Sequence, residues 1–119
     1  MSAVRRIPYA LLIGFALYLA PGCSEHPKQK AYVPKTDTVM ISQMKFQPAE
    51  LTVHAGDTVV WVNKDMVVHD ITQAPVGTWS SGPLASGKSW KMAVQQSDDY
   101  YCSIHVVMTG KVVVVNDDR

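Results

Sequence analysis

The sequence predicts an all-β protein, an antiparallel Greek-key β-sandwich of seven to eight short strands. Apolar residues alternate with polar ones in several runs after residue 36, which is the period of a β-strand. Turn-forming Gly, Pro, Asn and Asp separate these runs at short spacing. No stretch beyond residue 36 keeps a helical period for more than a turn or two, so the short strands are expected to pack as two layers.

Each expected strand follows from the local pattern of its run. Val39 and Ile41 alternate in the first run, which Phe46 closes, and the second run ends before a tight turn at Gly56. The third is apolar on both faces around Trp61, as in a strand at the centre of a sheet. In chain order, the expected strands cover residues 38–46, 50–53, 58–63, 68–72, 89–94, 98–103 and 110–116.

The middle of the domain is expected to be rich in loop. Prolines and glycines make residues 73–87 a connection with brief extended pieces, after a short strand at 68–72. Trp90, Met92 and Val94 then alternate with polar neighbours, so their side chains should face the core. A valine-rich run completes the last strand.

The first 22 residues are expected to be an export leader and not part of this fold. Arg5 and Arg6 precede an apolar run at 7–20, which is shorter than the roughly 20 residues of a spanning helix and typical of a secretory signal. Cys23 follows Ala-Pro-Gly and is interpreted as the lipid-modified cysteine of a bacterial lipoprotein. A soluble exported protein cut nearby and an uncleaved membrane anchor are the alternatives.

These assignments divide the chain into a signal peptide at 1–22, a flexible tether at 23–35 and a folded domain at 36–119. The tether is polar and contains two prolines. The protein is therefore expected to be exported to the bacterial periplasm and to be held at a membrane through a lipid on Cys23.

The charge balance excludes one class of partner. The 119 residues carry 11 basic and 10 acidic side chains, and loss of Arg5 and Arg6 with the leader changes the formal charge from +1 to −1. A balance this close to zero does not attract nucleic acid over long range. We expect a monomer that binds a protein partner and a membrane rather than nucleic acid.

The cysteines indicate where the chemistry lies. The sequence has two, and Cys23 lies at the processing site. Cys102 is then an unpaired thiol in an oxidising compartment, and an odd thiol there needs a reason. His105 and Met108 follow it at three-residue intervals, in the pattern C-x-x-H-x-x-M. One cysteine, two histidines and a weak axial methionine form the electron-transfer type of copper site, because these donors suit both oxidation states.

The second histidine of such a site has to come from elsewhere in the chain. Besides His105, the sequence has three histidines. His26 lies in the tether and His54 lies beside the Gly56 turn, whereas His69 lies in a connection between strands. His69 is therefore favoured as the second imidazole.

Three parts of the sequence resemble one family. The loop CSIHVVM, at 102–108, is similar to the ligand loop of the cupredoxins, the small blue copper proteins of the plastocyanin and amicyanin type. FQPAELTVHAGDTVVWVNKDMVVHDI, at 46–71, resembles the family's other signature, and WSSGPLASGKSWKM, at 79–92, resembles the segment that usually follows. The resemblance extends over 39–116. It implies one type 1 copper ion per chain, bound by four ligands: His69, Cys102, His105 and Met108.

Two residues depart from the family pattern. Asp70 follows the first histidine, where the family commonly has Asn, and Ile104 precedes the second, where the family often has Pro. Asp70 can still accept a hydrogen bond from Ser103, and its charge is expected to favour Cu(II) and lower the reduction potential. Ile104 restores a backbone N–H near the thiolate.

The resemblance implies a one-electron shuttle rather than an enzyme. His105 is expected to reach the surface within an apolar patch, where a redox protein such as a cytochrome or a copper or quinone enzyme would dock in a brief encounter. The patch residues would come from two loops: Met66, Val67, Ile104, Val106 and Val107.

Three other functions compete with this interpretation. A copper oxidase or nitrite reductase needs an open coordination position or a second copper cluster, and the spare histidines form no His-x-His pair. An immunoglobulin-like adhesion module would need an earlier cysteine to pair with Cys102, and none lies between Cys23 and Cys102. A copper carrier or storage protein could use the same four ligands and stays open as the alternative.

Overall fold

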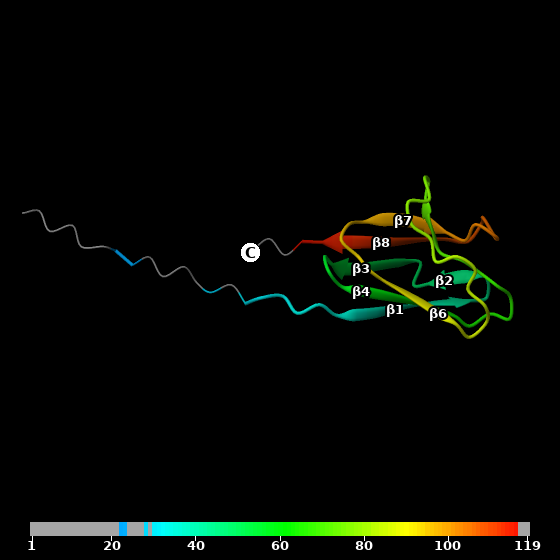
Figure 1. Cartoon of the computed structure of the whole chain (residues 1–119), viewed down its shortest axis with the longest axis horizontal. Helices are drawn as coiled ribbons and strands as arrows, with labels where there is room; N and C mark the ends of the chain where they lie inside the picture. The colour runs from blue at the N-terminus through cyan, green and yellow to red at the C-terminus, as the bar shows by residue number, and fades with distance from the viewer. Residues whose placement is uncertain (1–21, 24–27, 29, 117–119) are drawn as a thin grey trace, which may run out of the picture.

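The computed structural model describes residues 22, 23, 28 and 30–116 (Figure 1). The expected signal peptide therefore lies almost entirely outside the described residues. The regular structure of the described residues is all β, and no helix among them is long and apolar enough to cross a membrane. The strands are β1 (Thr36–Ser42), β2 (Lys45–Gln47), β3 (Glu50–His54), β4 (Thr58–Asn63), β5 (Thr72–Ala74), β6 (Ser89–Ala93), β7 (Asp98–Tyr101) and β8 (Thr109–Val115).

The strands form two four-stranded sheets that pack as a sandwich, which confirms the predicted class. One sheet has the order β2-β1-β4-β6 and the other β3-β8-β7-β5. The pairs β1–β4 and β3–β8 are parallel and the other pairs are antiparallel, so the sheets are mixed and not purely antiparallel. The reason is topological. The chain leaves the first sheet to place β3 in the second, and β4 then returns to lie beside β1 in the same direction.

The core between the sheets is centred on Trp61. Its ring lies 5.4 Å from the ring of Trp90 and packs edge-on against Tyr100 at 5.5 Å. Trp90 and Met92 are half-buried against this core, and Val94 is buried. The prediction that these three side chains face the core is therefore confirmed. The buried apolar residues are Val39, Ile41, Phe46, Val53, Val59, Trp61, Ile71, Leu84, Val94, Tyr100, Cys102, Met108 and Val112.

Two of the predicted strands are wrong. Residues 38–46 are not one strand but two antiparallel strands, β1 and β2, joined by a turn at Gln43 and Met44 where the backbone is left-handed. Residues 68–72 form a connection in which His69 makes an isolated bridge with Leu84, and β5 begins only at Thr72. The consecutive residues His69, Asp70 and Ile71 are all buried. A strand at the edge of this sheet would turn every second side chain away from the core, so the segment takes an irregular path that turns all three inward.

The parallel pair β1–β4 gives the sandwich two distinct ends. We call the end where β1 and β4 begin the proximal end, and the end where they finish the distal end. At the proximal end, Asp57 accepts hydrogen bonds from the Tyr32 hydroxyl at 2.6 Å and from the backbone amides of Lys35 at 2.7 Å and His54 at 2.9 Å. The segment that leads into β1 is thereby bonded to the domain at its proximal end (Figure 1).

Candidate metal centre

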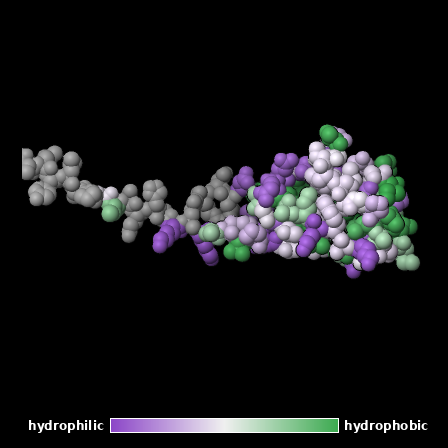
Figure 2. Space-filling view, in the orientation of Figure 1, coloured by the Kyte–Doolittle hydropathy of each residue, from purple (hydrophilic) through white to green (hydrophobic). Residues whose placement is uncertain are grey.

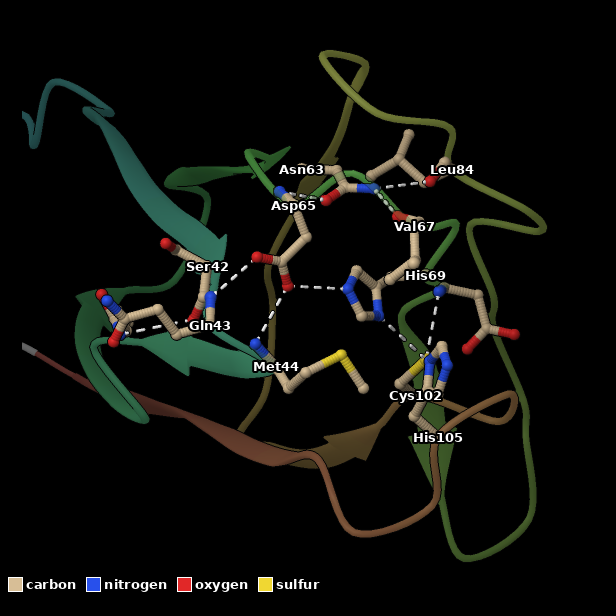
Figure 3. Close-up of polar contacts among 12 residues, drawn as sticks. Ser42, Gln43, Met44, Asn63, Asp65, Val67, His69, Leu84, Cys102 and His105 are labelled. Carbon is tan, nitrogen blue, oxygen red and sulfur yellow. Dashed lines mark hydrogen bonds and ion pairs between the residues drawn. The ribbon is translucent and has the colours of Figure 1, made fainter.

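Three side chains with metal-binding atoms converge at the distal end. The Sγ of Cys102 lies 3.8 Å from Nδ1 of His69 and 3.7 Å from Nδ1 of His105 (Figure 3). The three ligand atoms all lie within 4.8 Å of one another. Cys102 and His69 are fully buried, and His105 is half-buried. One thiol and two imidazoles therefore face a common point, and His105 is the most exposed of the three side chains.

The loop between β7 and β8 sets the position of Cys102 and His105. The amide of Cys102 donates to the Met108 carbonyl at 3.0 Å, the His105 amide to the Cys102 carbonyl at 3.2 Å, and the Met108 amide to the His105 carbonyl at 2.9 Å. These bonds close the loop into two consecutive turns. The Met108 side chain is 2% exposed and belongs to the same core cluster as Cys102.

The segment after β4 places His69 opposite that loop. His69 and Leu84 exchange two backbone hydrogen bonds, at 3.1 and 2.7 Å. The Asn63 side-chain amide donates to the carbonyls of Val67 at 2.8 Å and Leu84 at 2.9 Å. His69 is thus held through its own backbone by Leu84, and the loop before it is held by the Asn63 side chain.

Asp70 ties the two ligand-bearing segments together. Its backbone amide lies 3.4 Å from Cys102 Sγ, its Oδ1 accepts from the Ser103 amide at 2.6 Å, and its Oδ2 accepts from the Ser103 hydroxyl. The expected hydrogen bond from Ser103 is therefore present. Asp70 thus contacts the Cys102 thiol through its backbone amide and Ser103, the residue after Cys102, through its buried carboxylate.

Asp65 lies in the segment that carries the family resemblance, but the sequence analysis gave it no role at the site. Its Oδ2 lies 2.9 Å from Nε2 of His69. The Met44 amide, which donates to this carboxylate, holds the pKa of Asp65 below its usual value, so the group is ionised at neutral pH. A carboxylate four residues before a candidate histidine ligand was the signal available in the sequence.

Of the remaining histidines, the one that the structure describes does not join the cluster. His54 lies at the proximal end, where its ring packs 4.8 Å from that of Tyr32. His26 lies outside the described residues. Among residues 30–116, the group that can hold a metal ion is the one formed by His69, Cys102 and His105.

The spacing of these donors fits one metal ion. Bonds of about 2.3 Å to sulfur and about 2.0 Å to nitrogen that meet at about 120° place the two ligand atoms about 3.7 Å apart. The observed separations from Cys102 Sγ to the two Nδ1 atoms are 3.8 and 3.7 Å. A thiolate with two imidazoles in a trigonal plane is the donor set of an electron-transfer copper site. The residues therefore fit a copper ion.

A β-sandwich that encloses such a donor set at one end defines a class, the small copper proteins of electron transfer. Residues 35–115 match the family described as copper binding proteins, plastocyanin/azurin family. The chain belongs to this family, as a cupredoxin similar to amicyanin and plastocyanin.

Individual relatives agree with this membership. Amicyanin of Paracoccus versutus is 33% identical over 98 residues, which cover 76% of this chain and 74% of the relative. Amicyanin-alpha of Methylorubrum extorquens is 34% identical over 102 residues, which cover 81% and 84%. The structure of a methionine-to-glutamine mutant of amicyanin in the Cu(I) state superposes with a TM-score of 0.62 at 29% identity, over 67% of this chain and 82% of the other. The resemblance to the family is confirmed, and the protein is an electron carrier rather than an enzyme.

Proposed function

We propose that the protein shuttles single electrons through one copper ion bound by His69, Cys102, His105 and Met108. The observation that carries this proposal is the buried Cys102 thiol between two Nδ1 atoms, at 3.8 and 3.7 Å. The Met108 side chain, buried in the same loop, would supply the weak thioether donor of such a site. When bound, copper supplies a one-electron couple between Cu(I) and Cu(II).

The protein's own residues make the site rigid and dry. Backbone hydrogen bonds within residues 102–108 fix three of the four proposed ligands relative to one another. Leu84 fixes the fourth through its bridge to His69. Because these bonds do not depend on the charge at the centre, the ligands need to move little when an electron arrives or leaves.

We further propose that electrons enter and leave through His105 while a redox protein rests on the distal end. Figure 2 shows apolar residues gathered at the end of the domain away from the N-terminal segment. The exposed apolar side chains of the two loops beside the site are Met66 (92%), Val67 (46%), Val68 (42%), Ile104 (51%), Val106 (67%) and Val107 (86%), which we call the distal patch. None carries a charge, so the patch suits a brief encounter with an apolar surface on a cytochrome or a copper or quinone enzyme.

Export and anchoring form a second part of the proposal. The apolar run at 7–20 and the cysteine after it support a signal peptide at 1–22, a lipid on Cys23 and a periplasmic, membrane-held domain at 36–119. Cys23 is exposed, and the tether at 23–35 ends in the bonds of Tyr32 and Lys35 to Asp57. Globomycin-type inhibition of lipoprotein processing should leave an unprocessed precursor, and normal processing in its presence would contradict the lipid.

The copper proposal is tested by adding Cu(II) to the purified protein and recording its visible and electron paramagnetic resonance spectra. An intense thiolate-to-copper band is expected in the wild type and should vanish in Cys102→Ser. The matched control is Cys23→Ser, which removes the other, exposed cysteine and should leave the band unchanged. A colourless protein that exchanges Cu(I) readily would favour the copper carrier, and an intense band in Cys102→Ser would contradict the ligand assignment.

A further inference from the structure

The three tryptophans of the chain form one aromatic cluster in the sandwich, which we call the tryptophan cluster. Trp61 and Trp90 lie opposite each other in β4 and β6, with ring centroids 5.4 Å apart. Trp79, in the connection between β5 and β6, stacks on Trp90 at 5.9 Å and lies 6.3 Å from Trp61. The aromatic rings therefore form a continuous path through the core.

The inner end of the tryptophan cluster reaches the strand that leads to Cys102. Trp61 is fully buried and packs edge-on against Tyr100 at 5.5 Å. Tyr100 lies in β7, two residues before Cys102, and both side chains belong to the same buried core. The path between Trp61 and the proposed copper site thus consists of one aromatic ring and a short length of backbone.

The outer end of the tryptophan cluster has an acceptor for an indole proton. Trp79 is half-buried, and its Nε1–H donates to Oδ2 of Asp98 at 3.1 Å. The Gln73 side-chain amide lies 3.4 Å from Oδ1 of the same carboxylate. The Nε1–H of Trp61, by contrast, is buried and has no hydrogen-bond partner among the described residues. Trp79 therefore has what Trp61 lacks, a carboxylate next to its ring nitrogen.

This difference decides which ring can hold a radical. An indole that loses one electron becomes an acidic radical cation, and transfer of its N–H proton to a base converts it to the neutral radical. At Trp79 the hydrogen bond lets the proton move to Asp98 as the electron leaves, and lets it return when the ring is reduced. Trp61 can pass an electron on but cannot release its proton, because its nitrogen faces no acceptor.

We propose that the tryptophan cluster protects the Cys102 thiolate, by reducing peroxide-derived oxygen radicals at Trp79 with an electron from Cu(I). The proposal rests on the copper function above and adds a second reaction to it. The oxygen radical takes one electron from Trp79 and one proton from water, and becomes an alcohol or water. The Trp79 proton passes to Asp98. One electron from Cu(I) then crosses Trp61 to Trp79, the proton returns to Nε1, and Cu(II) remains.

This reaction does not compete with ordinary electron shuttling. An indole radical is a far stronger oxidant than Cu(II), so the electron moves from the copper centre to Trp79 and not in the other direction. Trp79 and Asp98 line a depression on the surface, whereas Cys102 is fully buried. A small oxygen radical therefore meets the indole before the thiolate, whose oxidation to a sulfonic acid is irreversible.

The first test is made on the metal-free protein, with ruthenium(III) tris-bipyridine generated by a light flash as the one-electron oxidant. Transient absorption should show the neutral indole radical in the wild type. Trp79→Phe should lose this signal. Asp98→Asn keeps a side-chain oxygen for the indole N–H but cannot take up its proton, so the radical cation should persist instead. A neutral radical that is unchanged in either variant would overturn the proposal.

Asp99→Asn is the matched control for Asp98→Asn. Asp99 is the next residue of β7, but its carboxylate is exposed and lies 3.7 Å from Nζ of Lys111. This variant should form the neutral radical as the wild type does. Equal loss of the neutral radical in both variants would show that net charge, and not the contact with Trp79, determines its formation, and would overturn the proposal.

The second test repeats the flash on the protein loaded with Cu(I). In the wild type, the indole radical should decay as the thiolate-to-copper band of Cu(II) appears. Trp61→Phe keeps an aromatic ring in the core and removes the oxidisable indole, so the Trp79 radical should persist and the coupled growth of Cu(II) should be lost. Trp79→Phe should lose that growth as well, without a change at a fully buried ring. Unchanged growth of Cu(II) in both variants would show that electrons bypass the tryptophan cluster.

Failure of the copper function and failure of this protective reaction are separate outcomes. A wild type that forms no intense band with Cu(II) lacks the copper centre, whatever the flash experiment shows. A wild type that forms the band, but whose neutral radical survives in Trp79→Phe, has the copper centre and no protective reaction through Trp79.

Discussion

At the scale of single residues, Met108 is the proposed ligand expected to bind most weakly. Met108→Leu should keep copper and raise the reduction potential, because loss of the axial donor disfavours Cu(II) more than Cu(I). Cyclic voltammetry measures the change. Met92→Leu is the control, since Met92 is half-buried in β6 and should leave the potential unaltered. Complete loss of copper from Met108→Leu would show that Met108 is more than a weak axial ligand.

Asp70 should act through its charge. Asp70→Asn keeps an acceptor for Ser103 and removes a negative charge beside Cys102. The reduction potential should rise by an amount on the order of 50 mV, since a nearby anion stabilises Cu(II). Asp99→Asn, at an exposed position paired with Lys111 on the sandwich surface, should change it little. A fall in potential on replacing Asp70 would refute this electrostatic interpretation.

At the scale of strands, Gly110 permits β7 and β8 to pair around Tyr100. These two residues lie opposite each other, and a Cβ on Gly110 would come within 2.4 Å of Cζ of the Tyr100 ring. Gly110→Ala should therefore destabilise the fold by about 1–3 kcal/mol or more, as overpacking does. Urea unfolding measures the loss.

Gly82 serves as the control for that substitution. It has a φ of +64° and no atom within 4 Å of its Cβ position, so Gly82→Ala tests backbone strain without a clash. A smaller loss of stability is expected there. If Gly110→Ala cost no more than Gly82→Ala, the tight packing of Tyr100 against β8 would be wrong.

Asp57, with the groups that donate hydrogen bonds to it at the proximal end, predicts a dependence of stability on pH. The Lys35 amide, with the Tyr32 hydroxyl and the His54 amide, lowers the pKa of Asp57 to about 2. A folded pKa below the ordinary value of 3.8 means that the carboxylate stabilises the fold above about pH 4 and loses this effect as pH falls toward 2. Asp57→Asn should thus have a lower free energy of unfolding than the wild type at pH 7. The difference between the two free energies should become smaller between pH 4 and pH 2. Chemical denaturation at both pH values measures it, and a constant difference would contradict the assignment.

Most strands could be predicted from sequence because alternation is local. β4, β6 and β8 carry their pattern in consecutive residues, and C-x-x-H-x-x-M lies within a single loop. Parallel pairing could not be predicted, since it depends on the path of the chain between the sheets. The turn at Gln43 and Met44 was also missed, because it uses a left-handed backbone without glycine. The contact of Asp65 with His69 was missed as well, although the position of Asp65 four residues before His69 was visible in the sequence.

At the scale of the whole molecule, the distal patch should govern encounters. Val107→Asp places a charge at a side chain that is 86% exposed beside His105. Electron self-exchange between the Cu(I) and Cu(II) forms, measured by NMR line broadening, should slow about tenfold because the two patches then repel each other. The visible spectrum should not change.

Val33→Asp is the matched control for that experiment. Val33 is 74% exposed and lies between Tyr32 and Lys35, which bond to Asp57 at the proximal end, so the substitution changes net charge equally and leaves the patch intact. Self-exchange should stay near the wild-type rate. Equal slowing by both substitutions would show that net charge, and not the patch, sets the rate.

β1 and β4 both run from the proximal end to the distal end. The segment that leads into β1 is bonded at the proximal end, whereas His105 lies at the distal end. β4 alone separates them by about 20 Å. In protein made without the lipid, attachment to gold through the Cys23 thiol would therefore hold the proximal end nearer to the metal than the redox centre. A film of molecules attached in this way should exchange electrons readily with soluble reagents and poorly with the metal beneath it.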